Sequence, residues 1–216
     1  MSNRFKDERV NSSSLQDLLL EESLEVIGVT GTPATGKKSV GIEIARKIGY
    51  EFLGINQVAM ENGCLESQDH LGPIANTKSL KMLLKSRLKA RRVVLVGHLL
   101  PLVTEADEVN LVVVLRCAPN ELWDRLSARG YNKEKVRLNV EAEVIDLCLS
   151  EAINKYGPHK IVEVDTTGSS SSITVSSILD HIINRSQKKN ASINWLKSLT
   201  QKDLLKLERR CCQSNV

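Results

Sequence analysis

Aromatic residues are scarce in this chain: Phe, Trp and Tyr together make up 3% of its 216 residues. A hydrophobic core therefore has to be built from leucine, isoleucine and valine, within an apolar fraction of 41%. The five cysteines show no C-x-x-C spacing, which argues against a zinc or disulfide framework and predicts reduced thiols. No apolar run approaches the roughly 20 residues of a membrane span, and the N-terminus lacks the apolar core of a signal peptide. These absences predict a soluble, cytoplasmic protein with no membrane partner.

Length and charge outline the organisation of the chain. A chain of 216 residues is most simply one domain with modest extensions. We expect residues 1–23 to be a disordered N-terminal extension, 24–185 to be the folded domain, and 186–216 to be a basic C-terminal appendage. The formal net charge of +4 is compatible with phosphate-bearing ligands or RNA, and establishes neither.

The most informative stretch lies between Val26 and Ile48. An apolar run at 26–29 predicts a buried strand, and apolar residues at 40, 44, 45 and 48 predict one face of a helix. Between them stands Gly31-Thr-Pro-Ala-Thr-Gly36-Lys37, the pattern G-x-x-x-x-G-K of a phosphate-binding loop. Glycines let backbone N–H groups curve around an oxyanion, the helix N-terminus adds its positive dipole end, and the lysine adds a mobile charge. We predict nucleotide binding; a glycine-rich turn that merely precedes a helix is the less favoured alternative.

The remaining elements predict an α/β fold. Further strands are expected at 50–53, 92–98, 110–116 and 161–164, and the continuous apolar runs within 92–98 and 110–116 are typical of parallel strands covered on both faces. These strands alternate with predicted helices, which favours a five-stranded parallel sheet with helices on both faces. Residues 54–77 are expected to form a long irregular connection of the kind used as a functional loop. One continuous helix is predicted from Lys133 to Lys155.

Three separated stretches resemble the adenylate kinase isoenzyme 6 family and its archaeal relatives. They are Thr30–Lys37, Gly97-His98 at the end of the third predicted strand, and Val114–Glu143, and their order and spacing match the family. The resemblance covers roughly Val26 to Ile183. It implies a P-loop nucleoside-monophosphate-kinase fold with strand order 2-3-1-4-5.

The resemblance also implies an activity and its residues. The activity is broad-specificity phosphoryl transfer from ATP to a nucleoside monophosphate, with ATPase activity. A role in late small-ribosomal-subunit maturation through ribosomal protein uS11 is implied as well. Separately, the basic tail from Ser186 could contact small-subunit rRNA through its phosphates. The family's catalytic positions fall on Lys37, His98 and Arg129. Its monophosphate-binding segment falls on residues 54–77, and its lid falls on residues 128–139. Its nucleotide contacts fall on Ala34, Gly36, Lys37, Lys38, Ser39 and Arg129.

The lid can be argued from the residues themselves. Basic side chains cluster in sequence around the Gly130-Tyr131 turn: Arg116, Arg125, Arg129, Lys133, Lys135 and Arg137. Phosphoryl transfer needs positioned positive charge around the transferring oxygens, and closure of a lid could supply it. A solvated basic helix end is the alternative. The planar guanidinium of Arg125 could stack on adenine.

Two departures, one from the general phosphate-loop pattern and one from the expected magnesium shell, bear on the chemistry. Lys38 stands where a hydroxyl for Mg²⁺ is usual, with Ser39 one residue later, and Val96 stands where an acid is expected. We therefore expect no protein ligand for the metal, and Mg²⁺ held mainly through phosphates and water. His98 either polarises a water or phosphate or is a core or capping histidine. A catalytically degenerate nucleotide-binding assembly factor is the alternative to the enzyme.

Overall fold

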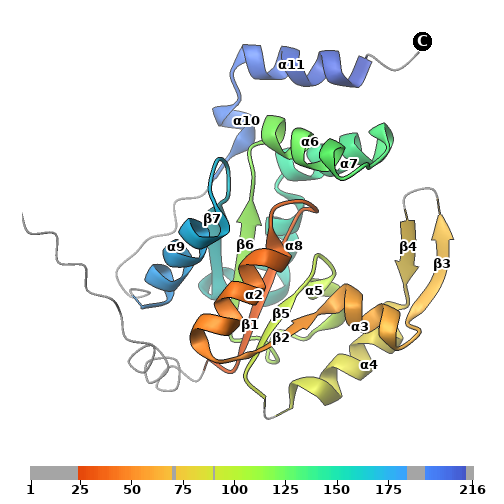
Figure 1. The fold of residues 1–216 in the computed structure, drawn as a ribbon, viewed down its shortest axis with the longest axis vertical. Helices are drawn as coiled ribbons and strands as arrows, with labels where there is room; N and C mark the ends of the chain where they lie inside the picture. The colour runs from red at the N-terminus through yellow and green to blue at the C-terminus, as the bar shows by residue number, and fades with distance from the viewer. Residues whose placement is uncertain (1–23, 70–71, 90, 184–192, 213–216) are drawn as a thin grey trace, which may run out of the picture.

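The computed structural model describes residues 24–69, 72–89, 91–183 and 193–212. Its centre is a five-stranded sheet in the order β2-β5-β1-β6-β7, and all of its strand pairs are parallel (Figure 1). The strands are β1 (Val26–Gly31), β2 (Glu51–Gly54), β5 (Val93–Val96), β6 (Leu111–Arg116) and β7 (Ile161–Asp165). Counted along the chain within this sheet, the order is the expected 2-3-1-4-5, so the predicted α/β fold is confirmed. The predicted disorder of 1–23 lies outside the described residues.

Helices cover both faces of this sheet, as the apolar runs predicted (Figure 1). Along β6, Leu111, Val113 and Leu115 face a core shared with α2 and α9, whereas Val112 and Val114 face a core shared with α4, α5 and α8. Alternate side chains of one strand therefore enter different cores, which is why the run is apolar throughout. The helices are α2 (Lys37–Ile48), α3 (Ile55–Glu61), α4 (Thr77–Leu88), α5 (Leu100–Val103), α6 (Pro119–Ala128), α7 (Lys133–Val144), α8 (Leu147–Tyr156), α9 (Ser171–Ile183), α10 (Trp195–Ser198) and α11 (Gln201–Cys212), with a 3₁₀ turn at Pro158–Lys160.

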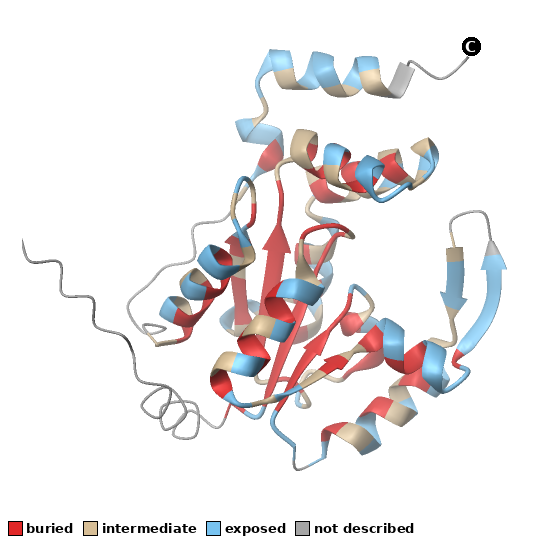
Figure 2. Cartoon of the chain, viewed as in Figure 1, coloured by how far each residue is buried: buried red, intermediate tan, exposed pale blue. Residues whose placement is uncertain are grey.

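A third, smaller core lies beyond the carboxyl ends of the strands. It joins α6 and α7 to the phosphate loop through Ala34, and Leu207 of α11 packs against it. Figure 2 shows the buried sheet and the buried inner sides of α6 and α7, with the outer side of α11 exposed. This core therefore connects the predicted lid to the predicted phosphate loop.

The segment 54–77 is more regular than predicted. It contains α3 and an antiparallel hairpin of β3 (Leu65–Asp69) and β4 (Gly72–Ala75), so the expectation of an irregular loop was wrong. The hairpin stands apart from the main sheet (Figure 1) and pairs its backbone groups with each other. Its strands bury little, and they therefore lack the apolar alternation by which strands are predicted.

The predicted helix from Lys133 to Lys155 is interrupted. Helix α7 ends at Val144, Asp146 adopts a left-handed φ of 57°, and α8 begins at Leu147. Aspartate tolerates this conformation better than most residues, and the Asp146 carboxylate is held there by the guanidinium of Arg116. The prediction of one continuous helix was therefore wrong. Among the helices of the described segments, none has the length and apolar composition needed to cross a bilayer.

Candidate active site

The phosphate loop lies at the carboxyl end of the central strand β1. A Cβ on Gly31 would lie 2.2 Å from the carbonyl oxygen of Leu115, so only glycine fits between the strands there. Ala34 and Gly36 both have left-handed φ angles, 71° and 92° respectively. The turn leads directly into α2, and within the described residues no side chain caps that helix at Gly36. The first N–H groups of α2 therefore remain open to an anionic ligand.

Lys37 spans this loop. Its Nζ donates hydrogen bonds to the carbonyl oxygens of Gly31 (2.8 Å) and Thr32 (2.7 Å). Burial lowers the pKa of Lys37 to about 8; the nearby Cys148 and Glu143 oppose that shift and the guanidinium of Arg129 adds to it. An incoming phosphate would favour the ammonium form again because it brings negative charge into this buried position.

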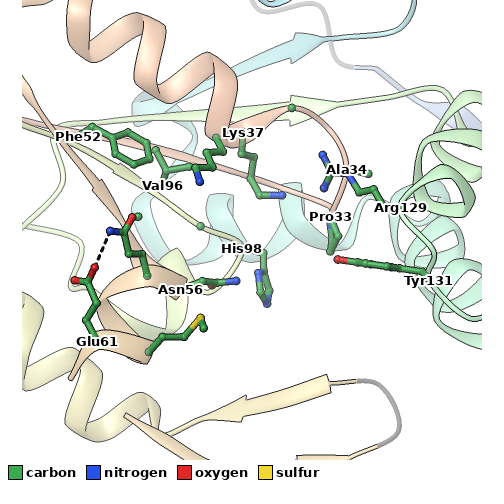
Figure 3. Close-up of a pocket in the computed structure, with 16 residues that line it drawn as sticks. Pro33, Ala34, Lys37, Phe52, Asn56, Glu61, Val96, His98, Arg129 and Tyr131 are labelled. Carbon is green, nitrogen blue, oxygen red and sulfur yellow. Dashed lines mark hydrogen bonds between the residues drawn. The ribbon is translucent and has the colours of Figure 1, made fainter. Parts of the chain in front are cut away.

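A cavity of about 720 Å³ opens in front of the loop (Figure 3). Its volume is in the range of small-molecule and cofactor sites. The wall is formed by the loop, by β2 and α3, by the end of β5 and by the turn after α6. The lining residues are Pro33, Ala34, Gly36, Lys37 and Lys38; Phe52, Gly54, Asn56, Gln57, Met60 and Glu61; Val96, Gly97 and His98; and Arg129 and Tyr131. Of the residues assigned from the sequence, the structure brings Ala34, Gly36, Lys37, Lys38, His98 and Arg129 to this one cavity, whereas Ser39 is exposed on α2 outside its wall.

His98 and Val96 lie at the carboxyl end of β5. The His98 ring points into the cavity (Figure 3) and is open to its solvent rather than packed in the core. Although the ring is exposed to the cavity, the protein around it displaces part of its water, and this desolvation, together with the positive charges of Lys37 and Lys135, lowers its pKa to about 4. The imidazole is therefore neutral near pH 7 and can both donate and accept a hydrogen bond. Val96 lines the same cavity and also packs against α2, where its Cγ2 would lie 2.4 Å from a Cβ on Gly41.

The turn between α6 and α7 reaches over the cavity. Arg129 and Tyr131 line the wall, and the Lys135 Nζ lies 4.4 Å from the centre of the Tyr131 ring. The same Nζ lies 3.1 Å from where a Cβ of Gly72 would stand, so the predicted lid approaches the β3–β4 hairpin. Two segments about sixty residues apart in the chain thus come together beside one cavity.

The predicted cluster of six lid cations includes one residue that the structure places in the interior. Arg116 is 1% exposed and makes ion pairs with Glu143, Glu163 and Asp146, so its assignment to the lid was wrong. A cation at the end of a central strand is buried here because three acids surround it. Arg137 pairs with Glu141 one turn along α7.

Arg125 is also engaged outside the cavity wall. Its guanidinium donates to the carbonyl oxygen of Thr166 (2.6 Å) and to the Glu121 carboxylate (2.6 Å). Its stacking on adenine stays a prediction.

Glu143 is a functional candidate that the sequence analysis missed. Its carboxylate is 1% exposed and accepts hydrogen bonds from the Thr32 hydroxyl (2.5 Å), Arg116 Nε (2.7 Å), the Cys117 N–H (3.2 Å) and Trp195 Nε1 (2.9 Å). The available signal was its position, because Glu143 continues the spacing of the buried residues Val136 and Val140 on α7. An acid on a buried helix face needs partners, and here one of them belongs to the phosphate loop.

The donors around the loop fit a nucleotide better than a protein-bound metal. The Thr35 hydroxyl is already used, because it donates to the Thr32 carbonyl oxygen at 2.9 Å, and Lys38 and Ser39 are exposed. Over the described ranges, no three His, Cys, Asp or Glu side chains gather into a metal site. The open N–H groups and Lys37 fit a polyphosphate, and Mg²⁺ would be held mainly by phosphate oxygens and water.

Comparison with known proteins first defines the class. The AAA domain family matches residues 27–146. A shikimate kinase from Acinetobacter baumannii is similar in structure with a TM-score of 0.56 and 17% identity, over 79% of this chain and 99% of that chain. A gluconokinase from Sinorhizobium meliloti gives a TM-score of 0.54 and 19% identity, over 75% and 93% of the two chains. The chain therefore shares its fold with these two proteins.

Sequence relatives narrow the class to a family. A "Putative adenylate kinase" from Pyrococcus abyssi is 37% identical over 79% of this chain and 91% of the relative. One of the same name from Methanosarcina barkeri is 33% identical, over 79% and 97% of the two chains. The "Adenylate kinase isoenzyme 6 homolog FAP7" of Saccharomyces cerevisiae is 33% identical, over 64% and 71%. The chain belongs to the adenylate kinase isoenzyme 6 family, as the motifs predicted. Its relatives place it among the nucleotide kinase-like phosphotransferases.

Proposed function

We propose that the protein transfers the γ-phosphate of ATP to a nucleoside monophosphate, with broad acceptor specificity. The observation that supports this most directly is the single cavity that joins the phosphate loop, the Arg129 turn and the α3 side. A kinase needs a donor site and an acceptor site that share one desolvated space, and it needs cations around the transferred group.

Each predicted residue has a role in this proposal. The backbone N–H groups of residues 34–39 bind the phosphates, and Lys37 neutralises their charge once it leaves its two carbonyl partners. Arg129 stabilises the charge that develops on the transferred group. Neutral His98 orients the attacking phosphate or a water by a hydrogen bond, because it lies in the same wall as Lys37.

The acceptor side needs a cation for the monophosphate, and residues 51–86 contain no arginine. The three lysines of α4 are not in the described cavity wall, and one of them, Lys81, is paired with Glu105. Lys135 is not in that wall either, but its ammonium lies beside Gly72 of the hairpin, and its positive charge helps to lower the pKa of His98, which is in the wall. We assign the acceptor phosphate to Lys135, and the polar amides of Asn56 and Gln57 to the acceptor nucleoside.

The test is nucleoside diphosphate formation from Mg-ATP with AMP, CMP or GMP as acceptor, beside Lys37→Ala. We expect diphosphate formation that depends on the acceptor, and a loss of at least about a hundredfold in the variant with its fold retained. Unchanged turnover in Lys37→Ala contradicts the role of the loop. Phosphate release without an acceptor supports the ATPase activity as the main reaction.

A second candidate is an ATP-dependent assembly factor of the small ribosomal subunit, with uS11 and small-subunit rRNA as partners. The exposed outer side of α11 supports it, because Lys202, Lys206 and Arg209 gather there around one surface hollow. Such a basic face suits phosphate contacts with RNA. Affinity capture with and without ATP tests this candidate, and the absence of any ribosomal component in either sample counts against it.

The degenerate alternative rests on Val96. If the missing acid abolishes turnover, Mg-ATP still binds at the loop while neither diphosphate nor free phosphate forms. Steady turnover in the assay above excludes this alternative.

A further inference from the structure

The C-terminal segment 193–212 docks on the helices that carry the predicted lid (Figure 1). Asn120 of α6 donates to the carboxylate of Asp203 (3.0 Å), and Arg210 donates to the carbonyl oxygen of Asn120 (3.1 Å). At the start of the segment, the Ile193 N–H donates to Glu163 of β7 (3.1 Å). The segment is therefore attached near both of its ends, to β7 at one and to α6 at the other.

Trp195 is the residue by which this segment enters the interior. It is 8% exposed, whereas the next residue of the short helix α10, Leu196, is 64% exposed. Its indole Nε1–H donates to the Glu143 carboxylate at 2.9 Å, and the guanidinium carbon of Arg116 lies 5.9 Å from the ring centre. A buried indole with its N–H on a buried anion is a directional contact and not only apolar packing.

The same carboxylate reaches the phosphate loop. Its Oε2 accepts from the Thr32 hydroxyl, and the Thr32 carbonyl oxygen accepts from Lys37 at 2.7 Å. One carboxylate thus joins residue 195 to the residue that orients the loop lysine. A buried anion keeps one orientation only while its donors are in place, so each donor affects the geometry presented to the others.

Arg116 cannot set that orientation alone. Its guanidinium is shared among Glu143, Glu163 and Asp146. If the Glu143 carboxylate rotated toward another donor, the other two acids would still balance the charge of the guanidinium. The Cys117 N–H and the Trp195 N–H also have Glu143 Oε1 as their acceptor, and of these donors only Trp195 comes from the C-terminal segment. The Trp195 hydrogen bond therefore forms only when the C-terminal segment is docked.

We propose that Glu143 is a positioning residue for the phosphate loop and that Trp195, from the C-terminal segment, sets its orientation. Docking of residues 193–212 then raises the affinity of the loop for the phosphates of ATP. This inference rests on the proposed nucleotide site, but it concerns binding and does not require that phosphoryl transfer follows.

The test compares Trp195→Phe with Trp123→Phe in the full chain. Both indoles are 8% exposed, and Trp123 packs in the same small core as Ala34 and lies 6.0 Å from Arg210 of the docked segment. Loss of packing alone would therefore affect both variants. We expect calorimetric titration to give Mg-ATP binding weaker by about tenfold or more for Trp195→Phe, the lower end of the range for one hydrogen bond to a charged group. Trp123→Phe should stay within about twofold of the unsubstituted chain.

A double-mutant cycle separates positioning from general destabilisation. Glu143→Gln should weaken Mg-ATP binding, and adding Trp195→Phe to it should weaken binding little further, because both act through one carboxylate. If Trp195→Phe does not fold, Thr32→Val removes the other end of the link at nearly constant volume and should show the same loss. Equal affinities for Trp195→Phe and Trp123→Phe, additive effects in the cycle, or normal binding by Thr32→Val overturn the inference. A chain that binds Mg-ATP without diphosphate formation refutes the proposed kinase and leaves this comparison intact.

Discussion

Replacing Arg116 by methionine tests whether this arginine holds the fold or serves the lid. Its guanidinium is 1% exposed and bonds Glu143, Glu163 and Asp146. Methionine fills a similar volume but leaves these acids without their cation. Removing one partner of a buried ion pair costs about 3–5 kcal/mol in the free energy of unfolding. For a chain of this length that corresponds to a melting temperature lower by about 6–20 °C.

A matched control lies on α7. Arg137→Met removes an arginine whose partner Glu141 is one turn away, and both side chains of this pair are largely exposed. Such pairs contribute about 0.3–0.5 kcal/mol, so the control should melt within about 2 °C of the unsubstituted chain. Urea unfolding of the three proteins gives the comparison directly. The two substitutions remove the same charge, and burial is the main difference between their sites.

The pH dependence sharpens this prediction. Burial already raises the pKa of Glu163, and Arg116 opposes that shift. Without Arg116 the folded-state pKa rises further above its unfolded value, so the folded variant binds more protons than the unfolded chain. The loss in free energy of unfolding of Arg116→Met, relative to the unsubstituted chain, should therefore be largest near pH 7 and should shrink as the pH falls through that pKa. An Arg116→Met protein that unfolds like the control but has lost turnover would refute the reasoning and return Arg116 to the lid.

Three further predictions concern the cavity. Mg-ATP affinity should fall as the pH rises above about 8, because Lys37 loses its proton there in the free protein, whereas bound phosphates raise its pKa. Binding should therefore take up protons, as measured by calorimetry in two buffers, and this uptake should disappear in Lys37→Met. Lys135→Met should raise the KM for the nucleoside monophosphate about tenfold, with a smaller effect on the KM for ATP. The control Lys133→Met should change neither KM by more than about twofold. Equal effects of the two variants contradict the assignment of Lys135 to the acceptor phosphate. Gly31→Ala should abolish nucleotide binding, because its Cβ would lie 2.2 Å from the Leu115 carbonyl oxygen and its φ is 133°, and a variant that still binds in a titration refutes that packing argument.

The parts of the fold that sequence predicted are those that depend on local pattern. The loop between Gly31 and Lys37 carries its own chemistry, and a run such as Leu111–Arg116 is apolar because both of its faces are covered. Three segments assigned separately, the loop, the strand end at His98 and the turn at Arg129, meet at one cavity. Their meeting follows from the sheet order, since the carboxyl ends of parallel strands share one edge.

The parts that sequence did not predict depend on partners far along the chain. Arg116 looks like a strand-end cation until Glu143 and Glu163 are placed around it. The break at Asp146 also depends on that arginine, because nothing in the local sequence, neither proline nor glycine, marks it. The hairpin at 65–75 was missed for a different reason: it is held by its own backbone pairing and buries too little to have a periodic signal.

The place of β1 in the sheet has a consequence for biosynthesis. Although β1 comes first among the strands, it lies at the centre and pairs with β5 and β6, which the ribosome makes much later. Such long-range parallel pairings are slow to form, and domains fold largely as units as they are made. The phosphate loop, encoded early, therefore acquires its final support late, once β6 has emerged beside it. Its supporting carboxylate receives a donor from residue 195, so a nascent chain gains its complete loop only after Trp195 has been made.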